Sequence, residues 1–98
     1  SEMCIRDRYD AFRDAKRAYN SSDLDNCQYY ARKAYRHFSD VESYASNCGC
    51  DGAESEAYDG YRDAKRAYRS SDLDNCQYYA RKAYRHGSYA EDEASSCN

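Results

Sequence analysis

One long internal repeat limits the folds that this chain can adopt. Residues 13–37 recur as residues 62–86, and the two copies differ only where Asn20 corresponds to Arg69. The period of the repeat is therefore 49 residues. Periods of this size are typical of stacked supersecondary units. We therefore expect two copies of one such unit to make up most of the chain.

Apolar residues at helical spacing predict two helices in each copy. In the first copy, a helix from about Arg8 to Asn20 has Phe12, Ala15 and Tyr19 on one face. The next helix, of about 24 residues, has apolar residues spaced alternately three and four apart, a heptad seam that faces a partner helix. These seam residues are Leu24, Cys27, Ala31, Ala34, Phe38, Val41, Ala45 and Cys48. The second copy repeats the seam as Leu73, Cys76, Ala80, Ala83, Gly87, Ala90, Ala94 and Cys97.

These patterns predict an all-α fold of four helices. The chain contains no proline, which suits long uninterrupted helices. We expect two tandem antiparallel helical hairpins that are linked by disulfides and stacked as a solenoid-like repeat. We assign residues 1–8 to a non-native leader, residues 9–49 to the first hairpin and residues 50–98 to the second.

The leader assignment depends on where the repeat begins. Similarity between the copies starts at Tyr9, matched to Tyr58, and does not extend further towards the N-terminus. Ser1 to Arg8 resemble the translation of a transposase sequencing adapter, which implies that these residues are not native and play no part in the fold. A genuine leader is the alternative, and the choice matters for Cys4.

Polar residues and glycine indicate where the helices begin and end. Ser22 with Asp25 forms a start that resembles a capping box, and the second copy repeats it with Ser71 and Asp74. Gly49 can adopt the left-handed conformation that ends a helix. We expect the third helix to follow it directly, capped by Asp51 with Glu54.

The seam of the second copy is thinner than that of the first. Phe38 and Val41 in the first copy correspond to Gly87 and Ala90 in the second. We therefore expect something else to fill the space beside Gly87, and a neighbouring subunit is a candidate.

The second hairpin resembles a tetratricopeptide repeat. The resemblance rests on small and aromatic residues at that family's spacings: Tyr61, Ala64, Tyr68, Cys76, Ala80 and Ala83. Lys65 lies within the same hairpin, at a position where the family prefers glycine. It implies that the hairpins stack into a solenoid and that a concave groove binds peptides.

Composition places the chain outside several functional classes. Its 18 acidic and 15 basic residues are interspersed along the sequence, with no block long enough to indicate a nucleic-acid-binding arm. No apolar run approaches the roughly 20 residues of a membrane span. We therefore expect neither a nucleic-acid partner nor a membrane span.

The six cysteines favour disulfides and an oxidising, extracellular location. The end of one hairpin lies beside its start, so Cys50 with Cys97 is the best-supported bridge, and Cys4 with Cys48 is its analogue. Cys27 and Cys76 remain to pair with each other across the repeats or between molecules. We expect no metal or other cofactor: Cys48 and Cys50 lack zinc-knuckle spacing, and both histidines are helical turns from any cysteine.

Two further features concern the surface. Asn20 begins an Asn-Ser-Ser sequon in the first turn and is a candidate for a glycan. The 13 tyrosines are too many for one small core, so several should contact a partner. We expect interface tyrosines among Tyr29, Tyr30, Tyr35, Tyr78, Tyr79, Tyr84 and Tyr89.

These features favour a structural function. We can assemble no nucleophile with a base, no paired catalytic carboxylates and no phosphate-binding loop, so we expect no enzyme. The duplication, the surplus of tyrosine and a hairpin face that one neighbour cannot cover indicate a secreted repeat protein that self-assembles into an extracellular filament or sheath. A monomeric peptide-binding adaptor of tetratricopeptide type and a small secreted effector or toxin are the alternatives.

Overall fold

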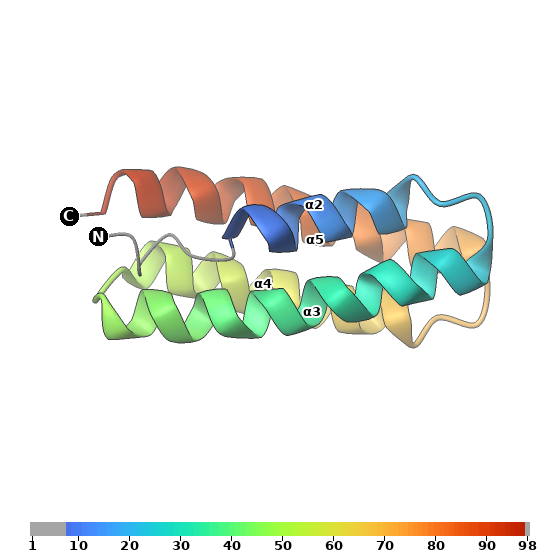
Figure 1. Cartoon of the computed structure of the whole chain (residues 1–98), viewed down its shortest axis with the longest axis horizontal. Helices are drawn as coiled ribbons and strands as arrows, with labels where there is room; N and C mark the ends of the chain where they lie inside the picture. Colours follow the sequence, from blue (N-terminus) through green and yellow to red (C-terminus); the bar gives the residue numbers. More distant parts are fainter. Residues whose placement is uncertain (1–7, 98) are drawn as a thin grey trace.

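A computed structural model of the protein describes residues 8–97, which form four α-helices. Each helix runs antiparallel to the one before it (Figure 1). The predicted all-α fold with two helical hairpins is confirmed. The helices are α2 (Arg8–Tyr19), α3 (Leu24–Asn47), α4 (Asp51–Tyr68) and α5 (Leu73–Ser95).

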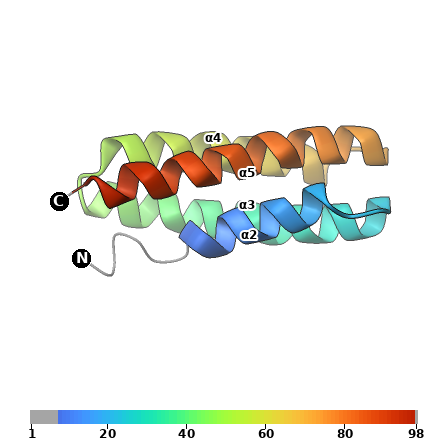
Figure 2. The same cartoon turned by 90° about the horizontal axis from the view of Figure 1, so that it is seen from above.

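The four helices close into a bundle of 40 × 16 × 16 Å. Helices α2 and α4 each pack against both α3 and α5, and α3 also meets α5 across the centre. Figures 1 and 2 show α2 and α5 side by side, so the first and last helices cover each other. A solenoid would leave its first and last helices apart. The solenoid-like arrangement is therefore not confirmed, and the uncovered hairpin face that we expected is absent from residues 8–97.

The core of the bundle consists mostly of alanine. The predicted seam of α3 is buried at six positions: Cys27, Ala31, Ala34, Phe38, Val41 and Ala45. Alanines of the other helices face them, and partly buried tyrosines such as Tyr35, Tyr61 and Tyr84 pack around this centre. Small side chains let the helix backbones approach closely, but each buries little apolar area. Disulfides therefore matter more for the stability of this bundle than for that of a bundle with a leucine core.

Phe38 fills the thin part of the second seam. A Cβ atom built on Gly87 would lie 3.3 Å from Cζ of Phe38 and 3.0 Å from the Cα atom of Phe12. One built on Gly60 would lie 2.5 Å from Cε1 of Phe38. Another side chain therefore fills this space, as expected, but the candidate filler was wrong: a phenylalanine of the first copy occupies it, and not a neighbouring subunit.

The helix starts differ by one residue from the expectation. The N-caps of α3 and α5 are Asp23 and Asp72, whose carboxylates accept hydrogen bonds of 2.8 Å from the backbone N–H groups of Asn26 and Asn75. The predicted caps, Ser22 and Ser71, lie one residue too early. Aspartate caps a helix at least as well as serine, and its negative charge also favours the N-terminal end of the helix dipole.

The short turn between α3 and α4 contains Gly49 in the predicted left-handed conformation, with φ of 71°. The N-cap of α4 is Cys50, which makes no side-chain capping hydrogen bond. Asp51 and Glu54 lie in the first turn of α4 rather than before it. Their charges still favour the N-terminal end of this helix.

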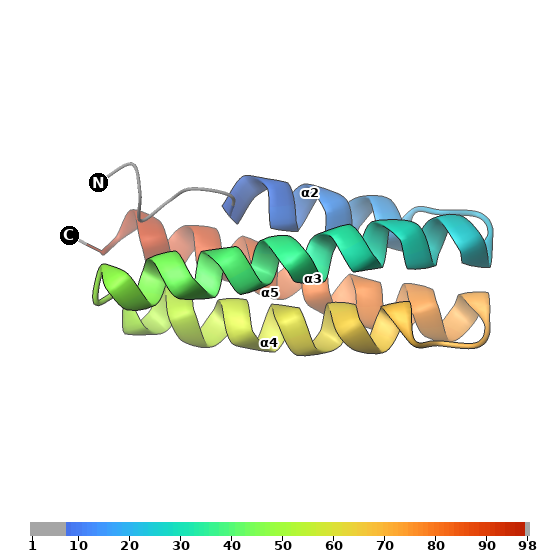
Figure 3. The same ribbon diagram turned by 60° about the horizontal axis from the view of Figure 1, so that its bottom comes forward.

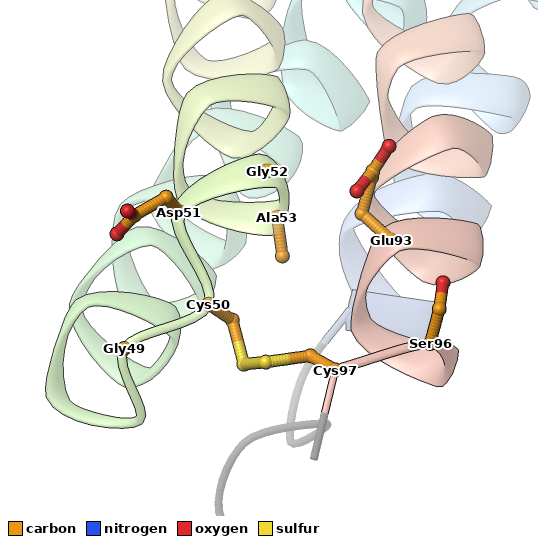
Figure 4. Close-up of a pocket in the computed structure, with 8 residues that line it drawn as sticks. All are labelled: Gly49, Cys50, Asp51, Gly52, Ala53, Glu93, Ser96 and Cys97. Atoms are coloured by element: carbon orange, nitrogen blue, oxygen red, sulfur yellow. A yellow bond between two sulfur atoms is a disulfide. The ribbon is translucent and has the colours of Figure 1, made fainter.

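Within residues 8–97, one disulfide joins the two copies to each other and a second closes the second hairpin. Cys27 with Cys76 connects the starts of α3 and α5, and Cys50 with Cys97 connects the start of α4 to the end of α5. Figure 4 shows this second bridge at the end of the bundle. The structure thus contains the favoured Cys50–Cys97 bridge and pairs Cys27 with Cys76 within one chain. The expected partner of Cys48, Cys4, lies outside the described residues.

The two copies also exchange equivalent hydrogen bonds near the Cys27–Cys76 bridge. The side-chain amide of Gln28 donates to the carbonyl oxygen of Ser70 at 2.8 Å, and that of Gln77 donates to the carbonyl oxygen of Ser21 at 2.7 Å. Each copy therefore donates one hydrogen bond to the interhelical turn of the other copy. The repeat in the sequence has become an approximate two-fold relationship in the bundle.

Candidate functional site

The fold separates the charges that the sequence intersperses. Residues 13–36 and 62–85 contain thirteen lysines and arginines and six aspartates. Residues 37–61 and 86–97 contain nine acidic residues and no lysine or arginine. The first pair of segments lies at the end of the bundle where α2 turns into α3 and α4 into α5, and the second pair lies at the opposite end (Figures 1 and 3). We call these ends the basic half and the acidic half.

Many of these charges are not neutralised within the bundle. The exposed arginines Arg32, Arg36, Arg81 and Arg85 of the basic half make no ion pair within residues 8–97. In the acidic half the same holds for Asp40, Asp51, Glu91 and Asp92. Figure 4 shows the carboxylate of Asp51 directed away from the bundle, while that of Glu93 is directed towards Gly52. The basic half therefore has unpaired arginines and the acidic half has unpaired carboxylates.

Partial burial, together with a neighbouring negative charge, raises the pKa of one carboxyl group in the acidic half. Glu42 on α3 lies in a shallow cleft that Glu54 of α4 also lines. Partial burial, and to a smaller extent the negative charge of Glu54, raise the pKa of Glu42 above its ordinary value of 4.5. A positively charged partner at this end would relieve that repulsion.

Equivalent clusters of tyrosines and cations lie on both hairpins. On the first hairpin the rings of Tyr29 and Tyr30 meet edge to face at 5.1 Å, with Lys33 over the ring of Tyr29. On the second hairpin Tyr78, Tyr79 and Lys82 repeat this arrangement. Cation–π contacts hold the rings in place while the outer ring of each pair stays 56 % exposed. One ring of each pair faces outward and the other packs partly inward.

The other candidate tyrosines differ in their surroundings. Tyr89 is exposed on α5. Tyr35 and Tyr84 are partly buried and pack within the chain, Tyr35 against Tyr61 and Tyr84 against Phe12. These two rings therefore have most of their contacts inside the bundle. Three further tyrosines are exposed that the sequence interpretation did not select: Tyr9, Tyr58 and Tyr68.

A histidine and a buried aspartate pair in each copy. Nε2 of His37 lies 3.5 Å from Oδ2 of the fully buried Asp14, and Nε2 of His86 lies 3.5 Å from Oδ2 of Asp63. In the second copy, Nδ1 of His86 also lies 2.9 Å from Oε2 of Glu56. Sequence reasoning missed these pairs because each joins residues on different helices. The available signal was an aspartate among the alanines of the core-facing side of each helix, Asp14 in α2 and Asp63 in α4.

The predicted glycosylation sequon lies at the surface. Asn20 is exposed directly after α2, accessible to a glycan. No cysteine within residues 8–97 is a free thiol, so this part of the chain offers no thiolate for catalysis. Of the helices in this range, none has the length and apolarity that crossing a bilayer requires. The two disulfides of the described residues fit an oxidising, extracellular location.

Comparison of the chain with protein-family models, with curated proteins and with solved structures gives no match.

Proposed function

We propose that this protein is a structural subunit that assembles with copies of itself outside the cell into an extended filament or sheath. The observation that carries the proposal is the separation of charge along a bundle 40 Å in length. The acidic half of one copy is complementary to the basic half of another. Complementary charge of this kind steers association and fixes the relative orientation of the partners.

The distribution of charge favours overlap along the sides of the bundle. The tip of the basic half is itself acidic, because it contains Asp23, Asp25, Asp72 and Asp74. Contact from end to end would place this tip against the acidic half of the next copy. Lateral overlap by about half a length instead places acidic residues against the unpaired arginines. Such a contact leaves a free half at each end of the assembly, so it adds further copies rather than closing.

Two exposed tyrosines, Tyr29 and Tyr78, lie where this overlap would bury them. Tyr29 precedes Arg32 on the outer face of α3, and Tyr78 precedes Arg81 on the outer face of α5. Tyrosine and arginine are enriched in protein interfaces because both bury area while keeping polar contacts. Since α3 and α5 are equivalent, each copy has two such faces and can bind two neighbours.

Negative-stain electron microscopy of the oxidised protein at low ionic strength tests the proposal. We expect elongated assemblies that are many bundles long. Uniform particles the size of one bundle would contradict it, as would closed pairs in which two copies lie antiparallel and satisfy each other. Uniform single bundles would favour the monomeric adaptor instead.

A further inference from the structure

A group of metal-ligating side chains lies between α4 and α5, within the acidic half of the bundle. Glu56 and Asp59 are three residues apart on α4 and therefore share one face of that helix. With His86 of α5 they place one potential ligand atom each within 4.8 Å of the others. All three side chains are partly exposed, so an ion can reach them.

A buried carboxylate positions the histidine. Oδ2 of Asp63 lies 3.5 Å from Nε2 of His86, and the side chain of Asp63 is only 7 % exposed. Nδ1 of His86 lies 2.9 Å from Oε2 of Glu56, a distance at which Nδ1 donates its hydrogen to that carboxylate when no ion is bound. An ion bound at Nδ1 would replace that hydrogen, and the imidazole hydrogen would then lie on Nε2, where the carboxylate of Asp63 accepts it. Histidines that bind metals commonly have a carboxylate on the nitrogen opposite the metal, which fixes the ring and raises its basicity.

The neighbouring cations are already engaged and do not occupy the site. Arg66 lies 3.3 Å from Asp63, Arg62 stacks over the ring of Tyr58, and Lys82 over that of Tyr78. A cleft of about 180 Å³, lined in part by Asp59 and His86, opens beside the cluster. It has room for water or an exogenous ligand to complete the coordination of an ion.

We propose that Glu56, Asp59 and His86 bind one divalent transition-metal ion, with zinc as the probe of choice. Two carboxylate oxygens and one imidazole nitrogen suit Zn²⁺, and three protein ligands leave a position for water. Tetrahedral zinc needs its ligands about 3.4 Å apart, given bonds of about 2.0–2.2 Å. Glu56 and His86 already lie closer than this, and a rotation of the partly exposed Asp59 side chain brings the third ligand in. The ion would link α4 to α5 in the middle of the second hairpin.

Calorimetric titration of the oxidised full chain with Zn²⁺ tests this site, and high ionic strength keeps it separate from assembly. We expect one ion per chain, removed by a chelator. His86→Gln and Glu56→Gln should each weaken binding at least tenfold. His37→Gln is the matched control, because His37 occupies the same repeat position and also pairs with a buried aspartate. The repeat equivalents of Glu56 and Asp59 are Asp7, which lies outside the described residues, and Asp10, whose Oδ1 lies 3.2 Å from Nη2 of Arg13.

Nuclear magnetic resonance of the wild-type protein gives a second readout that needs no variant. Zinc should shift the imidazole signals of His86 and leave those of His37 in place. Failure of the protein to bind Zn²⁺ at millimolar concentration would overturn the proposal. Undiminished binding by folded His86→Gln, or equal loss in His37→Gln, would overturn it as well. Circular dichroism establishes that each variant is folded.

Discussion

Phe38 occupies the space that Gly87, its counterpart in the second copy of the repeat, leaves empty. Cζ of Phe38 lies 3.3 Å from the position of a Cβ on Gly87. The centre of the closed bundle has room for one phenyl ring but not for two. The repeat therefore departs from identity just beyond residues 37 and 86, at the point where two equal side chains would collide.

Removal of this ring should cost more stability than any other single truncation in the core. Phe38 is the largest fully buried side chain, and its neighbours are mostly alanines that cannot move in to fill a cavity. We expect Phe38→Ala to lower the free energy of unfolding by about 3–5 kcal/mol. Urea denaturation followed by circular dichroism measures it. A loss below about 1 kcal/mol would contradict the packing described here.

The effect of Gly60→Ala on the free energy of unfolding should depend on the residue at position 38. A Cβ on Gly60 would lie 2.5 Å from Phe38, and overpacking costs about 1–3 kcal/mol, against about 1 kcal/mol gained in helix propensity. We expect a net loss in the wild type and a gain of about 1 kcal/mol in the Phe38→Ala background. A double-mutant cycle by urea denaturation measures the coupling. Additive effects would show that the two residues do not compete for space.

The two described disulfides should contribute about equally. They join cysteines separated by 49 and 47 residues, so each restricts a similar loop in the unfolded chain. Replacing either pair by serine should reduce the free energy of unfolding by about 2–4 kcal/mol. Thermal unfolding of the two double variants, compared with the wild type, gives the measurement. An unchanged melting temperature for either variant would show that its bridge does not constrain the fold.

Glu42 should make stability depend on pH. Its pKa is raised in the folded state, so its contribution to stability is fully present below the ordinary value of 4.5 and is lost as pH rises through the folded pKa. Glu42→Gln should therefore stabilise the protein at neutral pH, and this gain should vanish below pH 4.5. Urea denaturation of Glu42→Gln and the wild type, at neutral pH and below pH 4.5, measures the difference in the free energy of unfolding. A gain in stability of equal size at both pH values would mean that the charge of Glu42 is not its cause.

The fold could be predicted wherever a local pattern encodes it. The alternating spacing from Leu24 to Cys48 fixed the length and the buried face of α3, and helix geometry alone favoured Cys50 with Cys97. The closure of the four helices into a bundle could not be predicted, because it depends on the contact of α2 with α5, which lie at opposite ends of the described chain. Nor does a local pattern reveal that Gly87 makes room for Phe38.

The charge separation was available in the sequence but required the fold to interpret it. Short windows contain both signs, which indicates ordinary ion pairs within helices. The absence of any basic residue from positions 37–61 and 86–97 becomes meaningful once antiparallel helices bring these segments to one end. The cluster around His86 is different, because its ligands come from helices whose relative rotation the sequence does not specify.

The unpaired arginines allow a direct test of the proposed contact. We expect the combined variant Arg32→Gln, Arg36→Gln, Arg81→Gln and Arg85→Gln to assemble much less than the wild type at the same low ionic strength. All four side chains are exposed and unpaired within residues 8–97, so the substitutions should leave the bundle folded. Light scattering measures assembly, and circular dichroism establishes the fold. Assembly equal to that of the wild type would exclude these arginines from the contact.

Sedimentation velocity of the oxidised wild-type protein across a range of salt concentrations tests the central claim most directly. Contacts between exposed charges weaken as salt shortens the Debye length from about 30 Å at 0.01 M to about 3 Å at 1 M. We predict species well above the chain mass of 11.4 kDa at low salt, dissociating towards 11.4 kDa as salt rises. A single species of 11.4 kDa at every salt concentration would contradict the proposal that these bundles assemble through their charged halves.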